Sequence, residues 1–174
     1  GAKDWWPSKD TPGDKADSSD VWITADQFYT SVSNGKLLAV VDNGNGTRTY
    51  KWHNSYPIAP YLISIAMTNY QLYQSPFEYE KGKFMPVDHY VYPKIVTENL
   101  KSQLDLTAEM LKFYSYKFGM YPFLREKYGH AQFGWGGGME HQTVTSCVSF
   151  GSSLVAHELA HQWFGDKITC KDWQ

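Results

Sequence analysis

The sequence has little of what marks several large classes of protein. Its two cysteines, Cys147 and Cys170, are too few for a disulfide framework, and the residues leave open whether they pair. A formal net charge of -2 gives no electrostatic reason to expect binding to nucleic acid or to an anionic membrane. No apolar run approaches the roughly 20 residues of a membrane-spanning helix. No internal repeat or low-complexity tract is present either, so the composition is that of an ordinary globular protein.

The start of the chain also lacks a targeting pattern. Residues Gly1 to Pro7 do not show the basic, apolar and cleavage-site order of a signal peptide. The compartment therefore stays open, with the cell envelope or secretion favoured over the cytoplasm. Aromatic residues are plentiful instead, at 17% of the chain with 13 Tyr and 7 Trp. We expect them mainly in a core, although a groove that binds extended peptides would also use them.

The first half of the sequence has the pattern of strands and tight turns, with about seven strands expected between Val21 and Tyr92. Asn43 to Gly46 predicts the turn of a hairpin. The apolar run Tyr61 to Met67 predicts a strand buried on both faces, and Phe84 to Tyr92 predicts one more strand.

The second half changes to a helical period. Apolar residues three and four apart predict one long helix: Leu100, Leu104, Ala108, Leu111, Tyr114 and Phe118. Gly119 is placed to end that helix. A last helix is expected to be capped by Ser152 or Ser153, to run to Phe164 and to end at Gly165.

The last predicted helix carries the residues most suggestive of chemistry. His157 and His161 are four apart, so both imidazoles project from one face and can bind a single zinc ion. Glu158 lies beside that face, where it can act as a general base on a water. The plain alternative is an amphipathic helix with two partly buried histidines. The metzincin pattern does not fit, because Phe164 and Lys167 stand where that class has Gly and a third His.

Two motifs together carry a family resemblance. They are Gly137-Gly138-Met139-Glu140-His141 and the stretch Ala156 to Asp166. Tyr56 to Ser64 and Phe118 to Phe123 also match. The chain resembles the aminopeptidase N and leukotriene hydrolase family, whose catalytic domain is thermolysin-like.

The resemblance implies a fold class and a division of the chain. The expected fold is α+β: late strands of an antiparallel β-domain over residues 1–83, then the start of a thermolysin-like zinc-peptidase domain over residues 84–174. The family's third zinc ligand, a Glu, and its catalytic tyrosine would lie beyond Gln174. We therefore expect a fragment that is cut at both ends, binds zinc weakly or not at all, and is inactive alone.

The resemblance also implies a role for each motif residue. His157 and His161 match zinc ligands for one ion, and Glu158 matches the general base. Glu140 matches the glutamate that binds the free α-amine of a peptide substrate. The resemblance implies that the stretch around it binds substrate: Gly137, Gly138, Met139, Glu140 and His141. His141 departs from the family, which usually has Asn there, and an imidazole can ionise where an amide cannot.

The expected activity of the parent protein is a zinc-dependent removal of N-terminal residues from peptides. One alternative is a zinc endopeptidase that makes no use of Glu140. The other is a non-catalytic peptide-binding module with a relic zinc helix. The preferred N-terminal residue and the oligomeric state cannot be read from the sequence.

Overall fold

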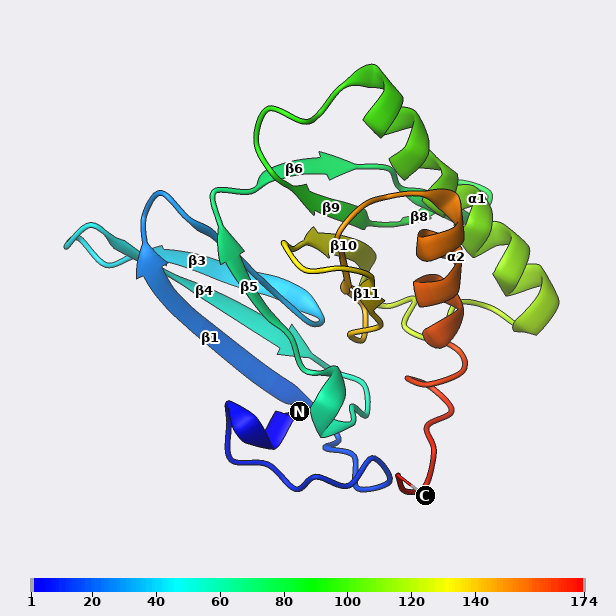
Figure 1. Ribbon diagram of the computed structural model, residues 1–174, viewed down its shortest axis with the longest axis horizontal. Coiled ribbons are helices and arrows are strands. Elements are labelled where there is room, and N and C mark those ends of the chain that lie inside the picture. The colour runs from blue at the N-terminus through cyan, green and yellow to red at the C-terminus, as the bar shows by residue number, and fades with distance from the viewer. Residues whose placement is uncertain (1, 174) are drawn as a thin grey trace.

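The computed structural model describes residues 2–173, with nine strands before residue 92 and both main helices, together with three further strands, after it (Figure 1). The strands are β1 (Ser19–Asp26), β2 (Thr30–Ser33), β3 (Lys36–Asp42), β4 (Thr47–Asn54), β5 (Ile65–Thr68), β6 (Gln71–Gln74), β7 (Phe77–Glu80), β8 (Lys83–Met85), β9 (Val87–Val91), β10 (Tyr128–Gln132), β11 (Gly138–Met139) and β12 (Thr145–Cys147). The helices are α1 (Glu98–Phe118) and α2 (Ser152–His161), with short 3₁₀ turns η1 (Ala2–Asp4) and η2 (Pro60–Leu62).

The first strands form an antiparallel sheet in the order β1-β4-β3, and β2 pairs separately with β5. The predicted hairpin is confirmed between β3 and β4. Its turn is closed by the Asn43 N–H, which donates to the Thr47 carbonyl at 3.1 Å. Gly44 and Gly46 both have positive φ, a conformation that glycine adopts without strain.

Two strand predictions were wrong. Tyr61 to Met67 is not one buried strand, because Pro60 begins the turn η2 and only Ile65 to Thr68 pairs, as β5. Ile65 and Met67 on β5 are 49% and 47% exposed, since this two-stranded pair leaves one face open. The single strand expected from Phe84 to Tyr92 is interrupted at Pro86, which separates β8 from β9. The described chain therefore has nine strands before α1, more than expected.

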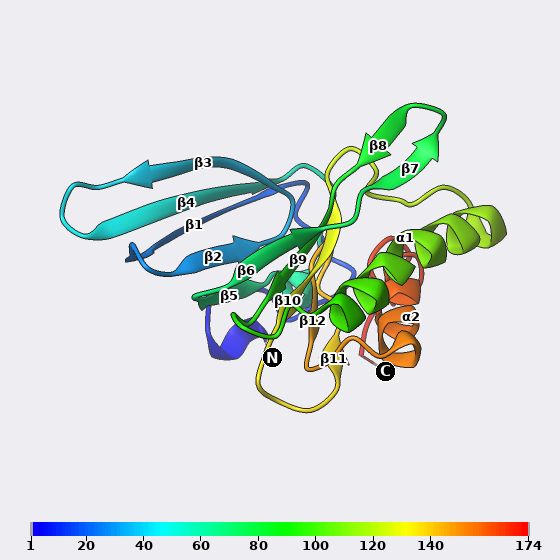
Figure 2. The same ribbon diagram turned by 90° about the horizontal axis from the view of Figure 1, so that it is seen from above.

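The second sheet has the order β11-β12-β10-β9-β6. Strands β9, β10 and β12 run parallel, while β6 and β11 lie antiparallel at the edges. Figures 1 and 2 show α1 and α2 on one side of this sheet and β1 to β5 on the other. The fold is α+β, as predicted. The boundary between residues 83 and 84 stays a prediction, and β6, which precedes it, pairs with β9, which follows it.

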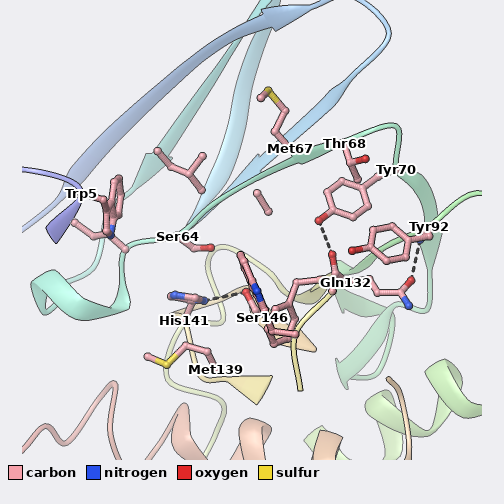
Figure 3. A pocket seen from close by; sticks show the side chains of 16 residues that line it. Trp5, Ser64, Met67, Thr68, Tyr70, Tyr92, Gln132, Met139, His141 and Ser146 are labelled. Carbon is pink, nitrogen blue, oxygen red and sulfur yellow. Dashed lines mark hydrogen bonds between the residues drawn. The ribbon is translucent and has the colours of Figure 1, made fainter. Parts of the chain in front are cut away.

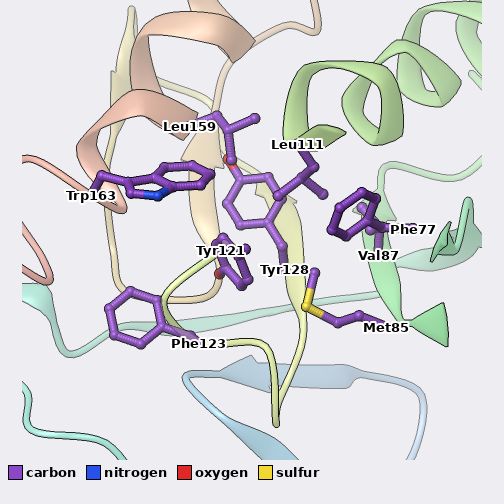
Figure 4. Packing of buried hydrophobic residues seen from close by; sticks show 9 residues of the cluster. All are labelled: Phe77, Met85, Val87, Leu111, Tyr121, Phe123, Tyr128, Leu159 and Trp163. Carbon is purple, nitrogen blue, oxygen red and sulfur yellow. The ribbon is translucent and has the colours of Figure 1, made fainter. Parts of the chain in front are cut away.

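Two buried clusters hold these layers together. Between the helices and the sheet, Leu111 of α1, Leu159 of α2 and Tyr128 of β10 pack with Trp163 (Figure 4). On the opposite side of the sheet, Trp52 of β4 packs edge-on against Tyr90 of β9 with ring centroids 6.4 Å apart. Apolar burial of this kind is the main stabilising contribution to a domain. The second sheet therefore lies between the two clusters and packs against both of them.

Helix α1 confirms the predicted long helix and its end at Gly119, while its N-terminal cap was not predicted. The Thr97 hydroxyl accepts a hydrogen bond from the Leu100 N–H at 3.2 Å, and Gly119 follows the last residue with φ of 91°. Helix α2 was predicted less well. Gly151, not a serine, occupies its N-cap position, and the helix ends at His161 rather than Phe164. The chain turns there because the Asp166 N–H bonds to the His161 carbonyl at 3.0 Å.

The two cysteines are not bonded to each other. Cys147 is buried in β12, and Cys170 is exposed. Within residues 2–173, no helix is long and apolar enough to cross a membrane.

Candidate metal centre and amine-binding strand

The two histidines of α2 point to a common position. Their Nε2 atoms are 3.2 Å apart. Two ligands of a tetrahedral zinc ion, each about 2.0–2.1 Å from the metal, are separated by about 3.4 Å. The Nδ1 of His161 lies 3.0 Å from the Phe164 carbonyl oxygen, to which a protonated Nδ1 donates. That tautomer leaves the Nε2 lone pair free for a metal, so the pair fits a zinc ion.

Glu158 lies between the histidines in sequence and is 4% exposed. Burial raises the pKa of its carboxyl, as does the charge of Glu140, whereas the two neighbouring histidines lower it. A carboxylate with a raised pKa is a better proton acceptor near neutral pH than an exposed one.

Strand β11 lies directly against this carboxylate. A Cβ added to Gly138 would be 2.5 Å from Oε1 of Glu158, which is closer than a Cβ atom approaches a non-bonded atom in proteins. Only glycine fits at that position without displacing the Glu158 side chain. Gly137, the preceding residue, has φ of 80°, also in the region that favours glycine. The sequence suggested that these glycines approach a substrate; the structure places Gly138 against the predicted base.

Glu140 follows β11 and is half-buried. Its charge, after burial, raises the pKa of both Glu158 and Asp166, and it contributes to the raised pKa of Tyr61. These groups therefore lie close enough to interact. Such a concentration of carboxyl groups provides a favourable setting for a cation, whether a metal ion or an ammonium group.

Met139 and His141 line a different space, a cavity of about 790 Å³ between β5 and the second sheet. Figure 3 shows its wall, which includes the aromatic side chains of Trp5, Tyr70 and Tyr92. The His141 ring is bonded through Nδ1 to the Ser146 hydroxyl at 3.0 Å. Burial lowers the pKa of His141 to about 4, so the ring is neutral at pH 7. The histidine at this position thus adds no charge beside Glu140.

Several buried polar residues near the site were missed from the sequence. Gln162 and Asp166 follow the zinc helix, and both are completely buried. The two carboxyl oxygens of Asp166 find no hydrogen-bond partner among the described residues, and burial raises its pKa well above the usual range. Lys127 is buried as well. Single buried polar residues leave no periodic signal, and only their position next to a motif could have drawn attention to them.

The part of the chain that the structure describes brings only these two histidines to the metal position. Among residues 2–173, no three His, Cys, Asp or Glu side chains are grouped so as to hold a metal ion. The sequence-based assignment of His157 and His161 as ligands therefore rests on their own geometry.

Comparison with known proteins gives a consistent result. Residues 102–174 match the model of the Peptidase family M1 domain. Leucine aminopeptidase 2 of Vanderwaltozyma polyspora is 29% identical over 99% of this chain and 26% of its own length. Aminopeptidase N of Haemophilus influenzae is 23% identical over 87% of this chain and 19% of its own length. The chain is thus similar to M1 peptidases and to proteins named aminopeptidases.

Solved M1 structures share the fold. A two-domain M1 zinc metallopeptidase variant bound to L-arginine superposes with a TM-score of 0.82 at 25% identity, over 99% of this chain and 40% of that one. Aminopeptidase A of Legionella pneumophila, in complex with aspartic acid, gives a TM-score of 0.84 at 24% identity, over 94% of this chain and 21% of that one. The resemblance to M1 enzymes read from the sequence is thereby confirmed. The chain spans about a quarter or less of the length of the curated relatives named here.

Proposed function

We propose that the whole protein is a zinc-dependent aminopeptidase that removes N-terminal residues from peptides. One observation carries the proposal: the Nε2 atoms of His157 and His161 are 3.2 Å apart, beside a buried Glu158 that interacts with Glu140. The residues that we propose as a metal-binding pair, a base and an amine anchor thus lie near one another. Because the chain covers 26% of its yeast relative, activity is assigned to the whole protein.

His157 and His161 would hold the zinc ion through Nε2, with further ligation from elsewhere in the whole protein. Zinc at such a site supplies a Lewis acid that polarises the scissile carbonyl and makes water a better nucleophile at neutral pH. The His161 ring is oriented for this role by its bond to the Phe164 carbonyl.

Glu158 takes the proton of the attacking water at its carboxylate and then delivers it to the amine that leaves. Its side chain is packed against Gly138, which limits how far the carboxylate can move toward β11. General bases held in this way typically contribute about a hundredfold to ten-thousandfold in rate.

Glu140 binds the ammonium group of the peptide's free N-terminus and so selects the first peptide bond. Strand β11 just before it is the edge of the second sheet, paired with β12 on one side. Its other edge can pair with the backbone of an extended peptide, a common mode of peptide binding.

A zinc endopeptidase and a non-catalytic peptide-binding module are the competing functions. Both are separated from the proposal by assaying the whole protein on matched peptides with free and N-acetylated N-termini, together with its zinc content. We expect about one zinc per chain and cleavage that requires the free amine. Equal cleavage of both peptides would indicate an endopeptidase, and protein purified without zinc would indicate a module that has lost its chemistry.

A further inference from the structure

The backbone that carries Glu140 is held by the glutamine that follows the second zinc histidine. Gln162 is fully buried, and its Nε2 donates to the carbonyl oxygens of Glu140 and His141, each at 3.4 Å. Its Oε1 accepts the Thr143 N–H at 2.9 Å. One side chain therefore bonds to the backbone of three residues in the segment from Glu140 to Thr143, which we call the anchor loop.

The anchor loop has an unusual conformation that its surroundings maintain. Thr143 has φ of 65°, which is rare for a β-branched residue. The Thr143 hydroxyl accepts the Gly35 N–H at 2.8 Å, and its carbonyl accepts the Lys127 ammonium at 3.2 Å. A residue stays in such a conformation only where neighbouring contacts fix it. The loop is thus held in one arrangement rather than free to adjust.

The contacts to the loop come from distant parts of the chain. Asn34, in the turn between β2 and β3, donates to the Gln142 carbonyl at 2.6 Å. The Tyr121 hydroxyl lies 3.3 Å from Oε1 of Gln162 and 3.1 Å from the Lys127 carbonyl oxygen, and its one proton is shared between these two acceptors. On the side of α2, the loop is bonded by the side chain of Gln162, the residue directly after His161.

We propose that Gln162 is a positioning residue that sets the distance between Glu140 and the zinc histidines. This inference rests on the proposed aminopeptidase function. Gln162 is adjacent to His161, and its amide donates a hydrogen bond to the Glu140 carbonyl. The metal position and the amine anchor are therefore linked through one side chain. An aminopeptidase needs a fixed distance between the metal and the amine anchor, because the ammonium group and the first carbonyl of its substrate are a fixed distance apart. Misplacement by about 1 Å can lower a rate about a hundredfold.

The inference is tested with the variant Gln162→Met in the whole protein. The methionine side chain is similar in length to glutamine but makes none of the three hydrogen bonds to the anchor loop. Gln132→Met is the matched control. Gln132 is also nearly buried, accepts the Tyr92 N–H at 2.9 Å and donates to the Val148 carbonyl at 3.4 Å, and neither partner belongs to the anchor loop. The probes are leucine hydroxamate and N-acetyl-leucine hydroxamate. Both bind zinc through the hydroxamate, so the ratio of their inhibition constants measures the contact with the free amine.

We expect the wild-type ratio to favour the free amine and to fall about tenfold or more in Gln162→Met. Zinc content should be unchanged, and Gln132→Met should keep the wild-type ratio. An unchanged ratio in folded, zinc-containing Gln162→Met would overturn the inference. A wild-type protein that does not distinguish the two hydroxamates would instead overturn the aminopeptidase proposal, so the two failures are distinguishable.

A second measurement does not depend on zinc or turnover. Amide hydrogen exchange over residues 140–143 should be faster in Gln162→Met than in Gln132→Met, because the Thr143 N–H has lost its acceptor. If Gln162→Met does not fold, Tyr121→Phe replaces it, since that change removes the hydroxyl shared by Oε1 of Gln162 and the Lys127 carbonyl. Tyr121→Phe should lower the hydroxamate ratio by a smaller factor in the same direction. Unchanged exchange and an unchanged ratio would both count against the inference.

Discussion

The two parts of the candidate site are positioned in different ways. Helix geometry alone brings His157 and His161 together, because residues four apart lie on one face. The anchor loop with Glu140 is positioned by side chains far away in sequence, from Asn34 to Gln162. The zinc helix is therefore a local structure that a short motif can specify. The amine anchor is a tertiary structure, and its accuracy depends on the fold around it.

The largest effect is expected at the local part of the site, from Glu158→Gln in the whole protein. The amide keeps the shape of the side chain but cannot accept the proton, so kcat should fall by about a hundredfold to ten-thousandfold. Zinc content and thermal stability should stay close to those of the wild type. A loss of zinc in this variant would show that Glu158 supports the metal rather than the proton transfer.

The next largest effect is expected at the loop, from Glu140→Ala. Losing a charge-assisted contact to the ammonium group is worth about 1.5–3 kcal/mol, or roughly tenfold to more than a hundredfold in kcat/KM. The loss should be large for free-amine peptides and small for residual cleavage of N-acetylated ones. Equal losses on both substrates, together with a lowered Tm, would mean that Glu140 serves the fold and not the substrate.

The same division explains what the sequence could predict. Helix α1, the β3–β4 hairpin and the zinc motif were predicted because each depends on neighbouring residues. The strand expected over Tyr61 to Met67 failed because Pro60 starts a 3₁₀ turn and β5 takes its partner, β2, from a distant segment. The prediction placed the end of α2 too late, because Gly165 has the pattern of a helix end. In the structure the helix ends at His161, whose carbonyl accepts the Asp166 N–H.

The contacts that support the anchor loop were not predictable in the same sense. Gln162 and Lys127 are polar residues within mixed sequence, and nothing local distinguishes them from exposed ones. Their roles depend on partners such as Thr143 and Ser33, which are distant in sequence. Only a structure can show that one glutamine bonds to both the carbonyl of the predicted amine anchor and the N–H of a strained residue.

A glycine pair probes the contact between the two parts of the site. Gly138→Ala places a methyl group 2.5 Å from Oε1 of Glu158, whereas a Cβ on Gly136 meets nothing within 4 Å. We expect Gly138→Ala to displace the base and lower kcat about tenfold, with a stability loss of about 1–3 kcal/mol from overpacking. Gly136→Ala should leave both nearly unchanged. Similar kinetics for the two variants would show that β11 can move away from α2, and would contradict the rigid placement of the loop.

The smallest effect is expected from the lysine that holds the far side of the loop. Lys127 donates to the carbonyls of Ser33 and Thr143, each at 3.2 Å. Burial lowers its pKa from 10.5 to about 8, although the charges of Asp88 and Glu126 oppose the shift. Between these two pKa values the unfolded chain binds more protons than the folded one, so the free energy of unfolding rises with pH. The rise contributed by this lysine is at most about 1.4 kcal/mol per pH unit.

Urea unfolding of this chain at pH 8 to 9.5 compares that slope between variants below the range in which tyrosines of the unfolded chain titrate. Burial raises the pKa of Cys147 to about 12, so this thiol adds a slope of opposite sign that all the variants share. Lys127→Met should remove the positive contribution, so its slope should be lower than that of the wild type. Lys36→Met, which changes an exposed lysine, should keep the wild-type slope. If Lys127→Met and Lys36→Met gave the same slope, the ammonium of Lys127 would have to be hydrated in the folded protein. The loop would then be held on that side by the Gly35 and Asn34 contacts alone, and the tertiary half of the site would depend on fewer buried groups than the structure indicates.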